Sequence, residues 1–89
     1  MTKQEIKEWV KTAKHIDTDY CEYDENGNNY ARDIFEKDGQ LYSLEYCNGE
    51  VMDHFIKNDQ GRLIRSGDYL PRRVKAITET IQSIRYEFV

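Results

Sequence analysis

The stretch Phe35–Phe55, FEKDGQLYSLEYCNGEVMDHF, contains two turn dipeptides, Asp38-Gly39 and Asn48-Gly49, with just enough chain between them for one strand. Each dipeptide suits a two-residue type I′ turn, which requires positive φ at both central positions. Gly27 and Gly61 continue the series of turn glycines at intervals of similar length on either side. The pattern predicts a ladder of hairpins, that is, an antiparallel β-meander.

The expected strands follow from these turns, and two-residue turns at Asn26-Gly27, Asp38-Gly39 and Asn48-Gly49 also fix their register. The strands lie at approximately 20–25, 29–36, 40–47, 50–57 and 62–66. In this register Phe35 faces Tyr42, Tyr42 faces Phe55, and Tyr46 faces Val51. One face is then apolar and should pack on helices; it carries Phe35, Tyr42, Leu44, Tyr46, Val51, Phe55 and Ile64. The other face mixes charged residues with Ile34 and Leu41, so we expect a helix, a partner or a second copy of the chain to cover part of it.

Helical patterns flank the strand region on both sides. Thr2 and Glu5 have the spacing of a capping box, and apolar residues then recur at helical spacing, which predicts a helix over 2–16. Pro71 suits the first position of a second helix over 71–86. Val74, Ile77, Ile81, Ile84 and Phe88 repeat with a helical period there, although the β-branched content leaves a final strand as the alternative. The predicted fold class is α+β, a single domain of residues 1–89 with a meander of about five strands between an N-terminal and a C-terminal helix.

Composition restricts the class of protein further. The 89 residues carry a net charge of −4 and include 12% aromatic residues, which argues against disorder. No apolar run approaches the length of a membrane span, and the first residues lack the apolar core of a secretory signal. We therefore expect a cytoplasmic protein. The register sets Cys21 opposite Arg32 and Cys47 opposite Tyr30, too far apart for a disulfide, so both cysteines should be free thiols.

Charge is distributed unevenly along the chain. Residues 17–53 hold eleven Asp and Glu against Arg32 and Lys37, a net of −9. The start of this block has no Lys or Arg and lies on the first strand, where charge protects an edge from association with other sheets. It also fits a recognition edge for a basic surface on another protein, and basic surfaces in cells often bind nucleic acid. The candidate partner-binding residues are Asp17, Asp19, Glu22, Asp24 and Glu25.

A basic block follows the acidic one. Residues 57–75 hold six Lys and Arg against Asp59 and Asp68, a net of +4. As an alternative function, this block could contact a nucleic-acid backbone, with nearby tyrosines as stacking surfaces. The candidate residues are Arg62, Arg65, Arg72 and Arg73. Overall acidity and the lack of a nucleic-acid-binding motif place direct nucleic-acid binding second.

Catalytic signatures are missing from the sequence. There is no phosphate-binding loop, nucleophile elbow or C-x-x-C motif, and His15 and His54 lack the paired spacing of a zinc site. Asp33 and Asp53 flank Leu44 on the predicted inner face and could form an acid/base pair, but a position at the sheet margin explains them better. We expect no enzyme activity, no cofactor and no metal.

Small size, acidity and a compact hairpin sheet between two helices resemble small phage or mobile-element proteins of the anti-CRISPR and anti-defence type. The resemblance is one of type across the whole chain and rests on no diagnostic motif. It implies a stoichiometric inhibitor that occupies a nucleic-acid or cofactor site of a host nuclease complex. The hypothesis is therefore a non-enzymatic binding protein with an acidic recognition edge; a structural subunit of a homo-oligomer, with the mixed sheet face between copies, is a further alternative.

Overall fold

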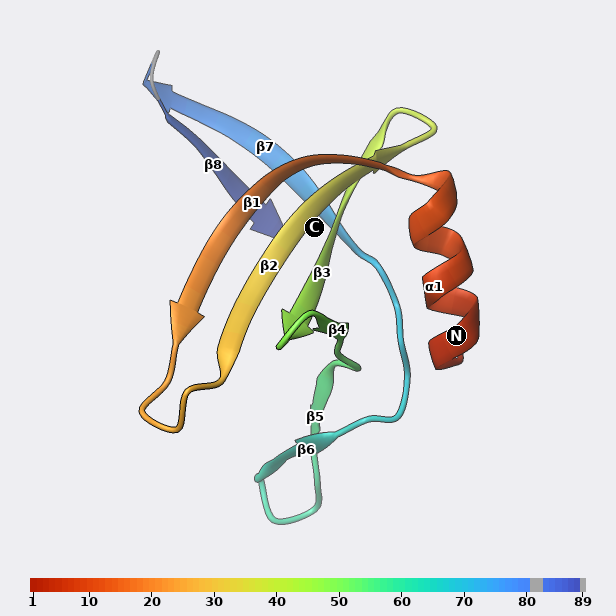
Figure 1. Ribbon diagram of the computed structural model, residues 1–89, viewed down its shortest axis with the longest axis vertical. Helices are drawn as coiled ribbons and strands as arrows, with labels where there is room; N and C mark the ends of the chain where they lie inside the picture. Colours follow the sequence, from red (N-terminus) through yellow and green to blue (C-terminus); the bar gives the residue numbers. More distant parts are fainter. Residues whose placement is uncertain (81–82, 89) are drawn as a thin grey trace.

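The computed structural model describes residues 1–80 and 83–88, and its elements run along the chain as one helix followed by eight strands (Figure 1). The elements are α1 Lys3–Thr12, β1 Lys14–Tyr23, β2 Asn29–Lys37, β3 Gln40–Cys47, β4 Glu50–Val51, β5 Phe55–Lys57, β6 Leu63–Arg65, β7 Arg72–Thr80 and β8 Ser83–Phe88. The main sheet has the order β1-β2-β3-β7-β8, with the short β4 also paired to β3. Strands β5 and β6 form a separate two-stranded sheet.

The two turn dipeptides of the central stretch form as predicted. Asp38 and Asn48 both have φ of 52°, and the glycines that follow them also have positive φ, as type I′ turns require. The register between β2 and β3 is confirmed, with Phe35 opposite Tyr42. Tyr46 opposite Val51 is confirmed as well. These pairings follow from turn chemistry within a few residues of each strand.

The first hairpin departs from the prediction because its loop is longer than two residues. The Asp24 carboxylate accepts hydrogen bonds from the backbone N–H groups of Asn26 and Asn28, both at 2.9 Å, and the Asp24 N–H donates to the Asn28 carbonyl. This loop shifts the register by one residue, so Cys21 lies opposite Ala31 and not opposite Arg32. Cys47 opposite Tyr30 is confirmed, and so are the two free cysteines.

The predicted strand over 50–57 is interrupted. Strand β4 ends at Val51, the Met52 N–H donates to the Glu45 carbonyl, and the chain then leaves β3. Phe55 consequently belongs to the separate β5–β6 hairpin and does not face Tyr42, which pairs with Arg73 of β7. Residues 41–43 of β3, which a continuous 50–57 strand would have paired with, pair with the distant strand β7 instead.

The predicted C-terminal helix over 71–86 is wrong, since its described residues form β7 and β8. The helical repeat of Val74, Ile84 and Phe88 is outweighed by the β-branched residues of the segment, which favour strands, and by an open edge on β3 that β7 can pair with. Ile81 lies outside the described residues. The fold is thus mostly β with one short helix, in place of a meander between two helices.

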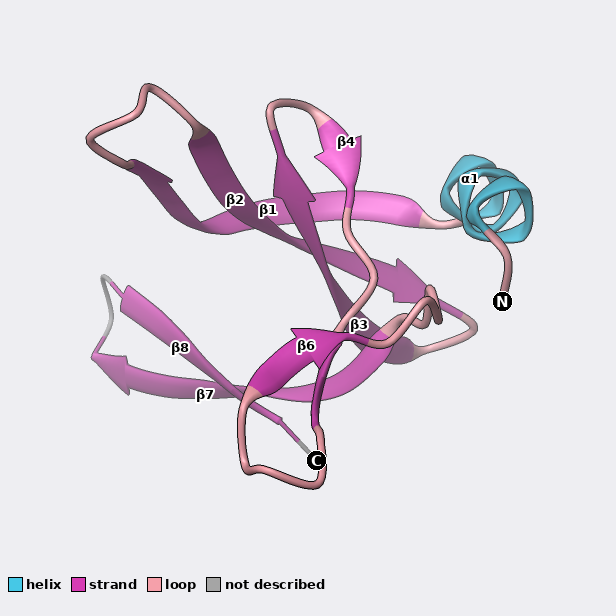
Figure 2. Cartoon of the chain, turned by 90° about the horizontal axis from the view of Figure 1, so that it is seen from below, coloured by secondary structure: helices cyan, strands magenta, loops and turns pink. Residues whose placement is uncertain are grey.

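The main sheet curls so that β8 crosses the face that we expected to be mixed and partly covered (Figure 2). The Tyr86 hydroxyl donates to the Asp17 carboxylate of β1 at 3.0 Å, and the Phe88 ring contacts the guanidinium groups of Arg32 at 5.2 Å and of Arg72 at 4.2 Å. Ile34 on this face is fully buried. The chain's own β7–β8 hairpin therefore covers part of this concave face, where we expected a helix, a partner or a second copy.

Helix α1 packs on the opposite face of the sheet. Ile6 is fully buried in a cluster with Phe35, Leu44 and Val51, and the Trp9 ring meets Phe35 edge-on. The capping box at Thr2 and Glu5 is confirmed. The helix ends at Thr12 and not at residue 16, because the chain from residue 14 onward pairs with β2 as β1.

Replacing the helix residue at the centre of this core gives the first prediction. Ile6→Ala should reduce the free energy of unfolding by about 2–5 kcal/mol, because it removes buried methyl groups and leaves a cavity. Urea unfolding followed by circular dichroism measures the change. Lys7→Ala, on the exposed neighbouring position, is the control, and an equal effect of both variants would contradict the placement of α1.

Candidate protein-binding surface

Strand β1 forms one edge of the main sheet, and its course is broken by two bulges. Ile16 and Asp19 are the extra residues, because the register shifts between His15 and Asp17 and again between Thr18 and Tyr20. Each bulge changes which side chains face which side of the sheet. As a result Asp17, Tyr20 and Glu22 all lie opposite concave-face residues of β2.

Two of the five predicted acidic residues, Asp19 and Asp24, bind other groups of the same chain. Asp19 is ion-paired with Arg32, and its side chain is 14% exposed. The Asp24 carboxylate stabilises the β1–β2 loop by accepting hydrogen bonds from Asn28. These hydrogen bonds keep the pKa of the Asp24 carboxyl below the ordinary value. These two carboxylates therefore stabilise the first hairpin and contribute little to a contact surface.

The other three acidic residues remain exposed. Asp17 and Glu22 each accept a tyrosine hydroxyl, from Tyr86 and Tyr20 respectively, and Glu25 lies in the β1–β2 loop. The hydrogen bond to Glu22 raises the pKa of Tyr20. For Tyr86, burial is the main cause of its raised pKa, with the hydrogen bond to Asp17 adding to it.

Exposed aromatic side chains accompany these carboxylates, whereas the sequence suggested such tyrosines only as stacking surfaces of the alternative nucleic-acid site. Tyr20 is 43% and Tyr23 72% exposed, both on the edge strand. Tyrosine is enriched in protein interfaces because it offers a large rigid contact area and a polar hydroxyl. We call the exposed residues of this edge the acidic strip; it consists of Asp17, Tyr20, Glu22, Tyr23 and Glu25. The sequence signal for the tyrosines is their alternation with acids in DTDYCEYDE, from residue 17 to residue 25.

The four arginines of the alternative nucleic-acid site lie on different elements and have different neighbours. Arg65 is ion-paired with Asp53 and lies over the Phe55 ring at 5.3 Å. Arg72 contacts Phe88 on the concave face, whereas Arg73 follows it on the opposite face of β7 and donates to Gln40 at 3.2 Å. Arg62 lies in the β5–β6 loop. Binding of a nucleic-acid backbone by these four residues stays the alternative prediction.

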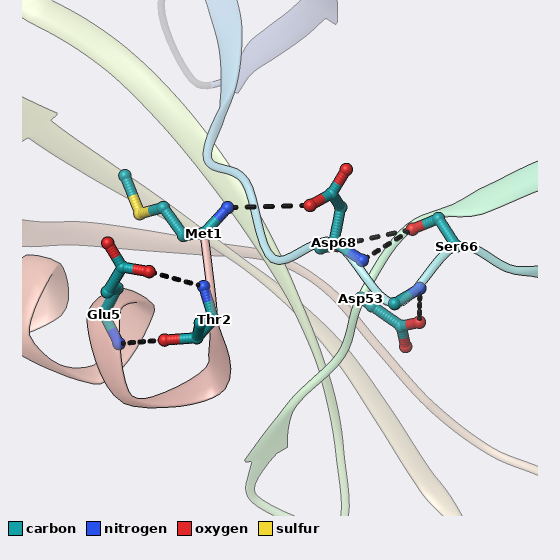
Figure 3. Close-up of polar contacts among 7 residues, drawn as sticks. Met1, Thr2, Glu5, Asp53, Ser66 and Asp68 are labelled. Atoms are coloured by element: carbon teal, nitrogen blue, oxygen red, sulfur yellow. Dashed lines mark hydrogen bonds and ion pairs between the residues drawn. The ribbon is translucent and has the colours of Figure 1, made fainter.

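Asp53 and Asp33 do not form the facing carboxylate pair that the sequence suggested. The buried Asp53 carboxylate accepts from Arg65 and from the Gly67 N–H at 2.7 Å. Figure 3 shows this carboxylate beside the turn at Ser66 and Asp68. Asp33 instead accepts from the Thr18 hydroxyl at 2.8 Å across the β1–β2 ladder. The two carboxylates thus belong to different parts of the molecule.

A cleft of about 430 Å³ lies beside β3, between the segment that follows β4 and the segment that leads into β7. Asp53, His54 and Arg72 contribute its polar lining, and Leu70 and Pro71 part of its apolar lining. Within residues 1–80 and 83–88, no group of three or more His, Cys, Asp or Glu side chains is arranged to hold a metal ion.

Comparison with known proteins gives no relative, since no protein-family model, curated protein or solved structure matches this chain. In the described part of the chain, no helix is both long and apolar enough to cross a membrane.

The Asp53 contacts give a prediction with a defined pH dependence. Burial raises the pKa of Asp53, but the hydrogen bonds from Arg65 and Gly67 outweigh it and keep this pKa below the ordinary value near 3.9. The charged carboxylate therefore stabilises the fold above about pH 4, and this stabilisation is lost as the pH falls through the lowered pKa. Asp53→Asn should lower the free energy of unfolding by about 1–3 kcal/mol at pH 7.

The measurement is urea unfolding of both proteins at several pH values between neutral and strongly acidic. The difference between wild type and Asp53→Asn should begin to shrink below about pH 4, where Asp53 of the unfolded chain becomes protonated, and should be lost as the pH falls through the lowered pKa of the folded protein. Asp59→Asn, in the exposed β5–β6 loop, is the control and should behave like wild type. A difference that is constant with pH would contradict this role of Asp53.

Proposed function

We propose that this protein is a non-enzymatic binding protein that occupies a basic, nucleic-acid-handling surface of another protein through the acidic strip. The observation that carries the proposal is the combination of exposed carboxylates and exposed tyrosines along one sheet edge. Carboxylates steer and orient the encounter with a basic partner, and the rings supply contact area. A basic surface in a cell is often one that binds nucleic acid.

The shape of β1 supports contact by side chains. A partner that adds a strand needs a regular row of backbone N–H and C=O groups, and the bulges at Ile16 and Asp19 interrupt that row. The same bulges turn Asp17 and Glu22 to one face, where they present charge together. The acidic strip therefore suits recognition of a charged surface and protects the edge against uncontrolled sheet association.

The expected mode of action is stoichiometric. A protein that covers a basic groove excludes the nucleic acid that would bind there, without any chemical step. Electrostatic attraction between exposed groups is screened by salt, so the complex should form faster and bind more tightly at low ionic strength. Inhibition of a nuclease or of a defence complex is the function that fits this mode.

Charge reversal in the acidic strip tests the proposal. The variant combines Asp17→Asn, Glu22→Lys and Glu25→Lys, so that the hydrogen bond from Tyr86 keeps an acceptor. The tagged proteins are immobilised, exposed to nuclease-treated host-cell lysate and eluted across a salt gradient. Wild type should retain a nucleic-acid-handling protein that is released at moderate salt, and the variant should retain at least about tenfold less, because like charges then face each other.

A matched control carries the same total change of charge at exposed positions elsewhere: Glu8→Lys, Glu50→Lys and Asp59→Asn. The control should retain as much partner as wild type. The recovered partner, separated from the chain and given nucleic acid again, should release that nucleic acid when the wild-type chain is added in equimolar amount. Equal loss in both variants would show that net charge alone is responsible. Nucleic acid bound by the purified chain itself would favour the alternative role of the basic block.

A further inference from the structure

The β5–β6 hairpin stands outside the main sheet. Its strands pair with each other at Phe55–Arg65, Ile56–Ile64 and Lys57–Leu63, and all six of these residues are exposed. Its base is closed by the contacts of Asp53 with Arg65 and Gly67 and by a hydrogen bond from the Ser66 N–H to the His54 carbonyl. A two-stranded hairpin is marginally stable in water unless something packs on it.

Large apolar side chains are concentrated on this hairpin. Leu63 is 65% exposed, and Phe55, Ile56 and Ile64 are each more than 40% exposed, with Leu70 close by in sequence. The hairpin strands show these residues on both faces, because neighbouring positions alternate in direction. An exposed apolar group of this kind marks an interaction surface.

Charge identifies the kind of surface that would cover the hairpin. Arg65 is ion-paired with Asp53, and of the other hairpin charges Lys57 and Arg62 outnumber Asp59, so the hairpin keeps a net positive charge. A complementary surface is acidic and partly apolar. The acidic strip of this chain has both properties, since its carboxylates lie among Tyr20, Tyr23 and the exposed Ile16.

The positions of the β5–β6 hairpin and the acidic strip in the fold allow two copies to form a closed, twofold-symmetric dimer. The β1–β2 loop and the β5–β6 hairpin both project at the same end of the long axis, and the view onto that end shows them apart from each other (Figures 1 and 2). A twofold axis between them would set the hairpin of each copy against the acidic strip of the other. In such an isologous dimer both copies use the same two surfaces, so no binding surface is left over to add further copies into a fibre.

We propose that this chain forms a reciprocal homodimer in which the β5–β6 hairpin of each copy docks on the acidic strip of the other. Apolar contact from the hairpin residues supplies the affinity, and the opposite charges set the register. The inference concerns the purified chain alone and does not depend on an outside partner. One consequence, that dimerisation and partner binding exclude each other, rests on the proposed function.

The test uses two variants with reversed charge. The strip variant carries Glu22→Lys and Glu25→Lys, and the hairpin variant carries Lys57→Glu and Arg62→Glu. The molar mass of each purified protein is measured by sedimentation equilibrium over a wide concentration range. Wild type should approach about 21 kDa, twice the 10.6 kDa of one chain, and each variant alone should dimerise with a dissociation constant at least about tenfold larger, because like charges face each other at both contacts.

Mixing the two variants is the decisive step. In the mixed dimer the acidic hairpin of one variant meets the basic strip of the other, while the remaining contact keeps its native charges, so dimerisation should return to the wild-type level. The matched controls, with the same changes of net charge on other exposed surfaces, are Glu8→Lys with Glu50→Lys and Lys7→Glu with Lys75→Glu, and they should dimerise as wild type does.

Three outcomes would overturn the proposal. One is a wild-type mass that stays monomeric at every concentration, and another is a dimer that neither variant weakens. The third is a mixture of the variants that does not recover. Circular dichroism of each variant establishes that it is folded, and none of these results bears on whether the lysate experiment retains a basic partner, so the two proposals fail separately.

Discussion

The path of the chain depends on the burial of one carboxylate, Asp53. A buried charge is costly unless it is paired and hydrogen-bonded. Asp53 meets this requirement with Arg65, the last residue of β6, and with Gly67, which follows the hairpin. These contacts close the base of the β5–β6 hairpin just after β4, at the point where the chain leaves β3, and the hairpin forms a separate sheet.

Release of the chain from β3 has a second consequence. The edge of β3 at Leu41, Tyr42 and Ser43 becomes open to β7, which arrives about thirty residues later in the sequence. Strand β8 then follows β7 and curls back over the concave face, where Tyr86 reaches β1. The burial of Ile34 and the position of Phe88 between two arginines both depend on this return.

The candidate surface is shaped by the same strands. The bulges on β1 determine the direction of its acidic side chains. Some of them stabilise the β1–β2 hairpin, such as Asp19 in its ion pair with Arg32, and others are exposed to solvent, such as Glu22. The run of acidic residues was visible in the sequence. The sequence did not show which of these residues are neutralised by an ion pair, because Arg32 reaches Asp19 only through a register that a bulge creates. For the same reason the exposure of Tyr20 and Tyr23 could not be read from their spacing.

The sequence by itself determined the local elements. Asp38-Gly39 and Asn48-Gly49 adopt positive φ because few other residues tolerate it, and they align β2 with β3 and β3 with β4 without help from distant residues. The capping box likewise starts α1 from contacts within one turn. What only the tertiary structure decided is which segment completes the sheet beside β3. Residues 72–80 carry both a helical repeat and β-branched side chains, and an open strand edge favoured the strand, since backbone hydrogen bonds to β3 are available only after distant parts of the chain have come together.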